Sequence, residues 1–97
     1  MKTENKLIEL LQEIENKEDF GEYTMTELEK IAEKAIKTIK KYKPESESIN
    51  ELKESIKLSD IFHKERSHKN VDNIMDVLRS TKFAIESFLY KEFDTDF

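Results

Sequence analysis

Apolar side chains recur every three or four positions between residues 25 and 42. They are Leu28, Ile31, Ala32, Ala35, Ile36 and Ile39. Because an α-helix has 3.6 residues per turn, this spacing lines one face of a helix and leaves the opposite face polar. The same spacing recurs in residues 4–16, 48–63 and 70–93, and the chain of 97 residues has only one proline and one glycine to interrupt helices. The sequence therefore predicts four amphipathic helices.

The connections between these segments are short, which favours antiparallel packing of neighbouring helices. We therefore predict an all-α fold, an antiparallel up-down four-helix bundle, with one helical domain over residues 1–93 and an acidic C-terminal tail at 94–97. A chain of this length has room for one hydrophobic core. The alternative is a set of helical hairpins that complete their core by dimerisation.

Three short motifs indicate where the helices begin and end. Thr24 and Thr26 are each followed three residues later by Glu, as in a capping box, so we expect the second helix to begin near Met25. Ser48 shows the same pattern at the start of the third helix. Pro44 cannot continue the second helix and is expected to end it.

Four aromatic residues lie off the main apolar faces. Phe20 and Tyr23 flank the single glycine, and we expect them to fold back over the core as a lid. Phe83 and Tyr90 lie seven residues apart on a polar side of the fourth helix. Exposed aromatic residues of this kind can contact a partner protein, or they can cover the edge of the bundle.

The last residues, KEFDTDF, combine acidic side chains with a terminal phenylalanine. This stretch resembles the acidic tail tip of bacterial single-stranded-DNA-binding proteins, which also ends in Phe, and the resemblance implies docking into a basic, apolar pocket. It covers only these last few residues. Asp94, Asp96 and Phe97, together with Phe83 and Tyr90, are therefore candidate partner-binding residues. A frayed tail is the alternative.

Both histidines lie in the basic stretch between the third and fourth helices. His63, Lys64, Arg66, His68 and Lys69 could converge on a phosphate or nucleotide beside the start of the fourth helix, or they could form an ordinary polar turn. The two histidines are five residues apart, which is about 140° around a continuous helix, so we predict no metal site.

The sequence holds no motif for catalysis or cofactor binding. It has no cysteine, no P-loop and no GxGxxG, GxSxG or HExxH pattern, and its one glycine cannot build a phosphate-cradling loop. Ribonucleases of the HEPN class use an Arg-x4-His motif; counted from Arg66, the histidine position is occupied by Val71. We therefore predict that the protein is not an enzyme and needs no cofactor.

The net charge of −5 and the pI near 5.1 argue against a general nucleic-acid binder. Lys30, Lys34, Lys37 and Lys41 nevertheless form a stripe on one side of the second helix, which is explained by solvation or by an acidic partner. No apolar run approaches the roughly 18 residues of a membrane span, and the acid-rich N-terminal stretch is unlike a signal peptide. With no cysteine, we expect a cytoplasmic protein.

Small size, acidity and helical content favour a protein that acts by binding another protein. Richness in Lys, Ile, Glu and Asn without Trp is typical of AT-rich bacterial or phage genomes. We expect an immunity protein, antitoxin or phage inhibitor, with a toxin, bacteriocin receptor or host defence protein as its partner. The general architecture is similar to that of class II bacteriocin immunity proteins. The alternative is a helical oligomer that binds a small ligand or nucleotide at the basic turn 63–69.

Overall fold

The computed structural model describes residues 2–95, which form four α-helices and no strand. The helices are α1 (Lys2–Glu15), α2 (Thr24–Tyr42), α3 (Glu47–Lys64) and α4 (Val71–Phe93). The prediction of an all-α fold with four helices is therefore confirmed. None of the helices in this range has a stretch both long and apolar enough to cross a membrane.

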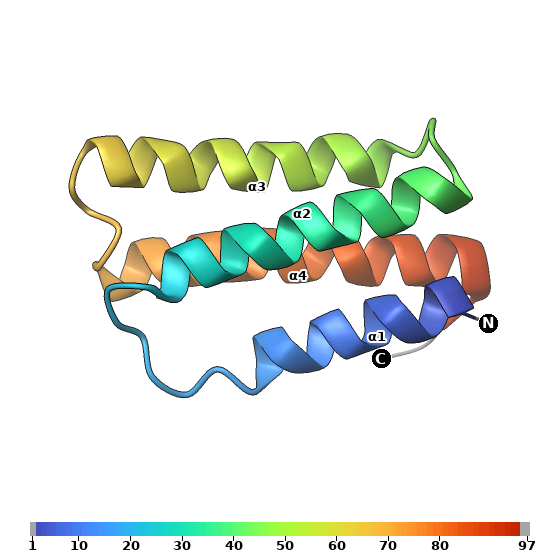
Figure 1. Cartoon of the computed structure of the whole chain (residues 1–97), viewed down its shortest axis with the longest axis horizontal. Coiled ribbons are helices and arrows are strands. Elements are labelled where there is room, and N and C mark those ends of the chain that lie inside the picture. The colour runs from blue at the N-terminus through green and yellow to red at the C-terminus, as the bar shows by residue number, and fades with distance from the viewer. Residues whose placement is uncertain (1, 96–97) are drawn as a thin grey trace.

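The helices pack as a bundle in which α2 and α4 lie between the other two (Figure 1). Both central helices lie next to all three remaining helices, whereas the backbones of α1 and α3 are not adjacent within residues 2–95. The described chain measures 38 × 26 × 16 Å. α2 and α4 are stacked along the shortest dimension, and α1 and α3 cover the two sides of this pair (Figure 1).

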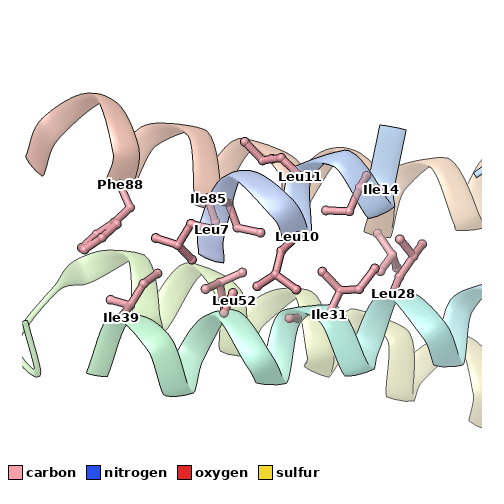
Figure 2. Close-up of a cluster of buried hydrophobic side chains, with 14 of the residues drawn as sticks. Leu7, Leu10, Leu11, Ile14, Leu28, Ile31, Ile39, Leu52, Ile85 and Phe88 are labelled. Carbon is pink, nitrogen blue, oxygen red and sulfur yellow. The ribbon is translucent and has the colours of Figure 1, made fainter. Parts of the chain in front are cut away.

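The core is built from the apolar faces that the periodicity defines. Figure 2 shows Leu7, Leu10 and Ile14 on the inner side of α1, between α4 and α2. From the other helices, the fully buried side chains include Met25, Leu28, Ile39, Leu52, Ile74, Ile85, Phe88 and Leu89. Removing this apolar surface from water is the main force that holds the four helices together. The core is enclosed by the helices of a single chain.

α2 begins at Thr24, one residue before the predicted start at Met25, but the predicted capping box does not form. Thr24 is buried, and its hydroxyl accepts a hydrogen bond from the Gly21 N–H (2.8 Å) and donates one to the Asp19 carbonyl (3.3 Å). The N-cap residue is Tyr23, whose side chain caps nothing. The threonine hydroxyl therefore closes the preceding loop instead of satisfying the first turn of the helix.

The other two helix starts use different polar side chains. Ser46, not Ser48, caps α3, because its Oγ accepts a hydrogen bond from the Ser48 N–H (3.2 Å). At α4, the Oδ1 of Asn70 accepts hydrogen bonds from the N–H groups of Asp72 (2.9 Å) and Asn73 (3.3 Å). Both caps have the extended backbone that this position requires.

The predicted aromatic lid forms only in part. Phe20 packs against the core, whereas Tyr23 is 71% exposed. Tyr23 sits at the N-cap position of α2, and its side chain makes no capping hydrogen bond. The loop therefore contributes one aromatic ring to the core and leaves the other free.

Candidate functional site

Phe83 and Tyr90 project from α4 into solvent. Their exposed fractions are 65% and 63%, although a phenylalanine five residues further along from Phe83, Phe88, is almost fully buried. Seven residues make nearly two whole turns, so the two exposed rings lie on the same side of the helix. Ile85 and Phe88 lie on the buried side, facing the other helices. The rings therefore do not cover an edge of the bundle.

Charged side chains flank the two rings on the same side of α4. Asp76, Arg79 and Glu86 are spaced seven, four and three residues from Phe83, as neighbours on one helix face must be. Within residues 2–95, none of these three forms an ion pair. We call this set, with Phe83 and Tyr90, the α4 aromatic surface. It is an exposed apolar patch with unpaired charges at its border.

The tail residue Asp94 ends α4. Its backbone is left-handed (φ 55°), and its N–H lies 3.0 Å from the Tyr90 carbonyl. The next residue, Thr95, donates a hydrogen bond to the Glu4 carboxylate on α1 (2.6 Å). The chain after α4 is thus tied to α1 up to this point. The other two tail candidates, Asp96 and Phe97, lie outside the described residues.

The turn between α3 and α4 brings the two histidines together. The rings of His63 and His68 stack with centroids 4.5 Å apart and planes at 14°. The turn reverses at Arg66, whose φ of 58° is left-handed. His68 Nδ1 is buried and has no hydrogen-bond partner in the described part of the chain. The two rings therefore face each other instead of aiming their nitrogens at a common point.

The cations of this turn lie at the surface, and one of them is paired with a carboxylate. Lys69 lies 3.7 Å from the Glu22 carboxylate, in an exposed ion pair, and Lys64 and Arg66 are exposed. The first free N–H groups of α4 are already bonded to Asn70. Ligand binding at this turn remains a prediction, and within residues 2–95 no group of three or more His, Asp or Glu residues could hold a metal ion.

A partly buried polar network joins α2 to α3 beside the histidines, and the sequence pattern did not reveal it. Ser59 is fully buried; its hydroxyl donates to the Glu29 carboxylate (3.2 Å) and lies 3.4 Å from His63 Nδ1. The same nitrogen is 2.9 Å from the Ser59 carbonyl, and His63 Nε2 is 3.4 Å from the Thr26 hydroxyl. All these contacts are satisfied when the ring proton of His63 is on Nδ1, which then donates a hydrogen bond to the Ser59 carbonyl, and Nε2 accepts one from the Thr26 hydroxyl.

The electrostatics of this network centre on Glu29. Burial raises the pKa of the Glu29 carboxyl above its ordinary value of 4.5, and the neighbouring Asp60 raises it further through repulsion and a shared hydrogen bond. Ser59 and His63 act in the opposite direction with smaller effect. The chemistry differs from a catalytic triad, because here the carboxylate contacts the serine and not the imidazole.

No protein-family model matches the chain, and no curated protein or solved structure matches it. The functional proposals below rest on the side chains and surfaces of the chain itself.

Proposed function

We propose that this protein is a non-catalytic helical bundle that binds another protein through the α4 aromatic surface. The observation that carries the proposal is the exposure of Phe83 (65%) and Tyr90 (63%) on the side of α4 that faces away from the core. Apolar surface left in water forgoes about 25 cal/mol per Å² of stabilisation, and aromatic residues dominate the binding energy of many interfaces.

The charges around the rings define the chemistry of the partner. Asp76 and Glu86 outnumber Arg79 on the α4 aromatic surface, and the chain as a whole carries a net charge of −5. An apolar groove bordered by basic side chains would complement this surface. A toxin, a bacteriocin receptor or a host defence protein would supply such a groove, and the protein would then act as an immunity protein, antitoxin or phage inhibitor in the cytoplasm.

The proposal of a non-catalytic protein is supported by the burial of Ser59, the serine that contacts His63. Ser59 has no exposed surface, so a substrate cannot reach its hydroxyl. Its network instead joins Glu29 on α2 to His63 on α3, which suits a structural role.

We also propose that the bundle has the antiparallel up-down order. Support comes from polar contacts between helix ends: Lys17, just after α1, pairs with Glu27 in the first turn of α2 (2.8 Å), and Thr95, just after α4, bonds to Glu4 in the first turn of α1. The order is tested by NMR distances between these ends, and a contact between the first turns of α1 and α2 would contradict it.

The proposed function is tested by replacing Phe83 and Tyr90 together with Ser. Tyr23→Ser is the matched control, because Tyr23 is also exposed but lies in the loop before α2. Immobilised wild type, F83S/Y90S and Y23S would be exposed to extracts of the cells that make the protein. Any protein captured is then purified, and its binding is measured by calorimetry.

Wild type and Y23S are expected to capture the same protein and to bind it equally well after purification. F83S/Y90S should lose at least tenfold in affinity while its thermal unfolding temperature stays unchanged. Equal binding by all three proteins would contradict the proposal. If wild type self-associates in sedimentation and F83S/Y90S does not, the partner of the α4 aromatic surface is a second copy of the chain and not a different protein.

A further inference from the structure

Five lysines from two helices line one groove. Lys2 and Lys6 come from α1, and Lys34, Lys37 and Lys41 come from α2. Two threonines, Thr3 and Thr38, complete the lining. The α2 lysines belong to the stripe that the sequence shows, but the two α1 lysines join them only because α1 packs beside α2. We call this the lysine groove.

No carboxylate lines the lysine groove, and within residues 2–95 none of its lysines forms an ion pair. The hollow further along the same two helices is different, because its lining includes Glu13 and Glu27. There, Lys17 is largely buried and bonds to Glu27 at 2.8 Å. The lining of that hollow therefore has two carboxylates among three lysines, one of which, Lys34, it shares with the lysine groove, whereas the lining of the lysine groove has lysines and no carboxylate.

The lysines are the charged side chains that line this groove. The first turn of α1 and the last turn of α2 lie beside each other, since Lys2 and Lys41 line the same hollow. A helix N-terminus carries about +0.5 charge and a C-terminus about −0.5, so the two dipoles oppose each other there. The ammonium groups remain as the source of a local positive potential on a protein of net charge −5.

The lining also restricts the chemistry of the ligand. It contains no aromatic ring on which a base could stack and no arginine that could bind an oxyanion with two parallel hydrogen bonds. Lysine ammonium groups act as point charges, which suits several phosphoryl groups in a row. The groove has a volume of about 410 Å³, within the usual size of small-ligand sites.

We infer that the lysine groove binds a small anion that carries a chain of at least three phosphoryl groups. Such a chain occurs as inorganic polyphosphate or as the triphosphate of a nucleotide, and the two share the part that the groove recognises. This inference goes beyond the proposed function, because the groove lies between α1 and α2 and uses none of the residues of the α4 aromatic surface.

A compact ligand suits this protein better than a long polyanion. At physiological ionic strength the Debye length is about 8 Å, so an anion inside the groove is shielded from most of the acidic surface beyond it. A nucleic-acid duplex would extend past the groove along a protein 38 Å long and meet that acidic surface. Strong duplex binding normally requires a basic excess over the whole domain.

The test is calorimetric titration of the whole chain with inorganic tripolyphosphate, a nucleoside triphosphate and orthophosphate at low salt. We expect saturable binding of one tripolyphosphate per chain and at least tenfold weaker binding of orthophosphate. Equal affinity for both triphosphates would assign binding to the phosphoryl chain alone. Tighter binding of the nucleoside triphosphate would identify a nucleotide as the ligand.

Variants locate the site. Lys6→Gln, Lys34→Gln and Lys37→Gln together should lower tripolyphosphate affinity at least tenfold. The control triple variant has the same change in charge at exposed lysines outside the groove: Lys53→Gln, Lys57→Gln and Lys91→Gln. It should change affinity less than twofold.

Three results would overturn the inference. The first is that wild type fails to bind either triphosphate saturably. The second is that the two triple variants lose affinity equally, which would indicate only a diffuse charge effect. A 12-base-pair DNA duplex or a hexaglutamate peptide that binds more tightly than both triphosphates would assign the groove to a different ligand class. Circular dichroism of both variants verifies that the helices are intact. If the groove variant loses helicity, tripolyphosphate affinity is measured instead for K2Q/K6Q and K34Q/K37Q, each of which alters one helix only.

Discussion

The carboxyl group of Glu29 lies where its surroundings disfavour ionisation. Burial and the nearby Asp60 disfavour the anion, and the hydrogen bond from Ser59 and the proximity of His63 only partly offset this. The pKa of Glu29 is therefore higher in the folded protein than in the unfolded chain. Between these two pKa values the folded state binds more protons than the unfolded state, so its stability falls as pH rises through this window.

Glu29→Gln should therefore stabilise the protein at pH 7, because the amide keeps an acceptor for Ser59 but carries no charge. The gain should shrink as pH falls below the ordinary carboxyl value of 4.5, where Glu29 is protonated in both states. Urea unfolding of both proteins at pH 7 and pH 4 measures the difference. A gain that is the same at both pH values would exclude ionisation of Glu29 as its cause.

Two phenylalanines on α4 offer a direct test of which side is core. Phe88 is buried and packs its ring edge-on against Tyr42, with centroids 6.0 Å apart, whereas Phe83 is 65% exposed. We expect Phe88→Ala to lower the free energy of unfolding by about 3–5 kcal/mol and Phe83→Ala to change it by less than about 0.5 kcal/mol. Denaturant titration measures both, and a large loss for Phe83→Ala would place that ring inside an interface within the chain.

At the scale of helices, the location of each element follows from local signals. The apolar period defines all four segments, and α2 ends at Tyr42, two residues before Pro44. The capping residues are harder to predict, because several polar side chains near the start of each helix could accept hydrogen bonds from its first N–H groups. Thr24 has the sequence of a cap, but its hydroxyl bonds to the loop that precedes it. Its partners depend on how residues 17–23 fold, which a short motif cannot show.

Repulsion among the lysines of α1 and α2 should lower the stability of the protein at low salt, and added salt should screen it. Lys2 and Lys6, and likewise Lys37 and Lys41, are four residues apart, and each such like-charged pair costs roughly 0.2–0.5 kcal/mol. Repulsion between the two helices adds to this, so K6Q/K34Q/K37Q should be more stable than wild type by about 1 kcal/mol at low salt.

The gain should vanish near 1 M salt, where the Debye length is only about 3 Å. Thermal unfolding of wild type, K6Q/K34Q/K37Q and K53Q/K57Q/K91Q across a salt series measures it. If the control variant gained as much as the groove variant, the lysines of the groove would not be the source of the repulsion.

For the whole molecule, the sequence predicted the helices and one surface but not the contacts between distant segments. The exposure of Phe83 and Tyr90 follows from their position on a periodic helix, which is a local property. The stack of His63 on His68 depends on the left-handed backbone at Arg66. Lys2 and Lys41 line the same groove only because α1 packs beside α2. Such long-range features depend on the assembled bundle and could not be predicted from spacing.

The assembled bundle separates two surfaces of different chemistry. The α4 aromatic surface exposes two aromatic rings with two acidic residues and one basic residue at its border, and the charged side chains that line the lysine groove are all lysines. Because they share no residue, a protein partner and a phosphoryl ligand could be bound at the same time. Loss of one activity in a surface variant should therefore leave the other intact.

Site-specific photo-crosslinking tests the proposed partner binding most directly. Benzoylphenylalanine would replace Phe83 in one protein and Tyr23 in another, both exposed aromatic positions on the same bundle. On irradiation in the cells that make the protein, position 83 should form a discrete adduct with one other protein, and position 23 should not. No adduct at position 83, or the same adducts from both positions, would contradict binding through the α4 aromatic surface.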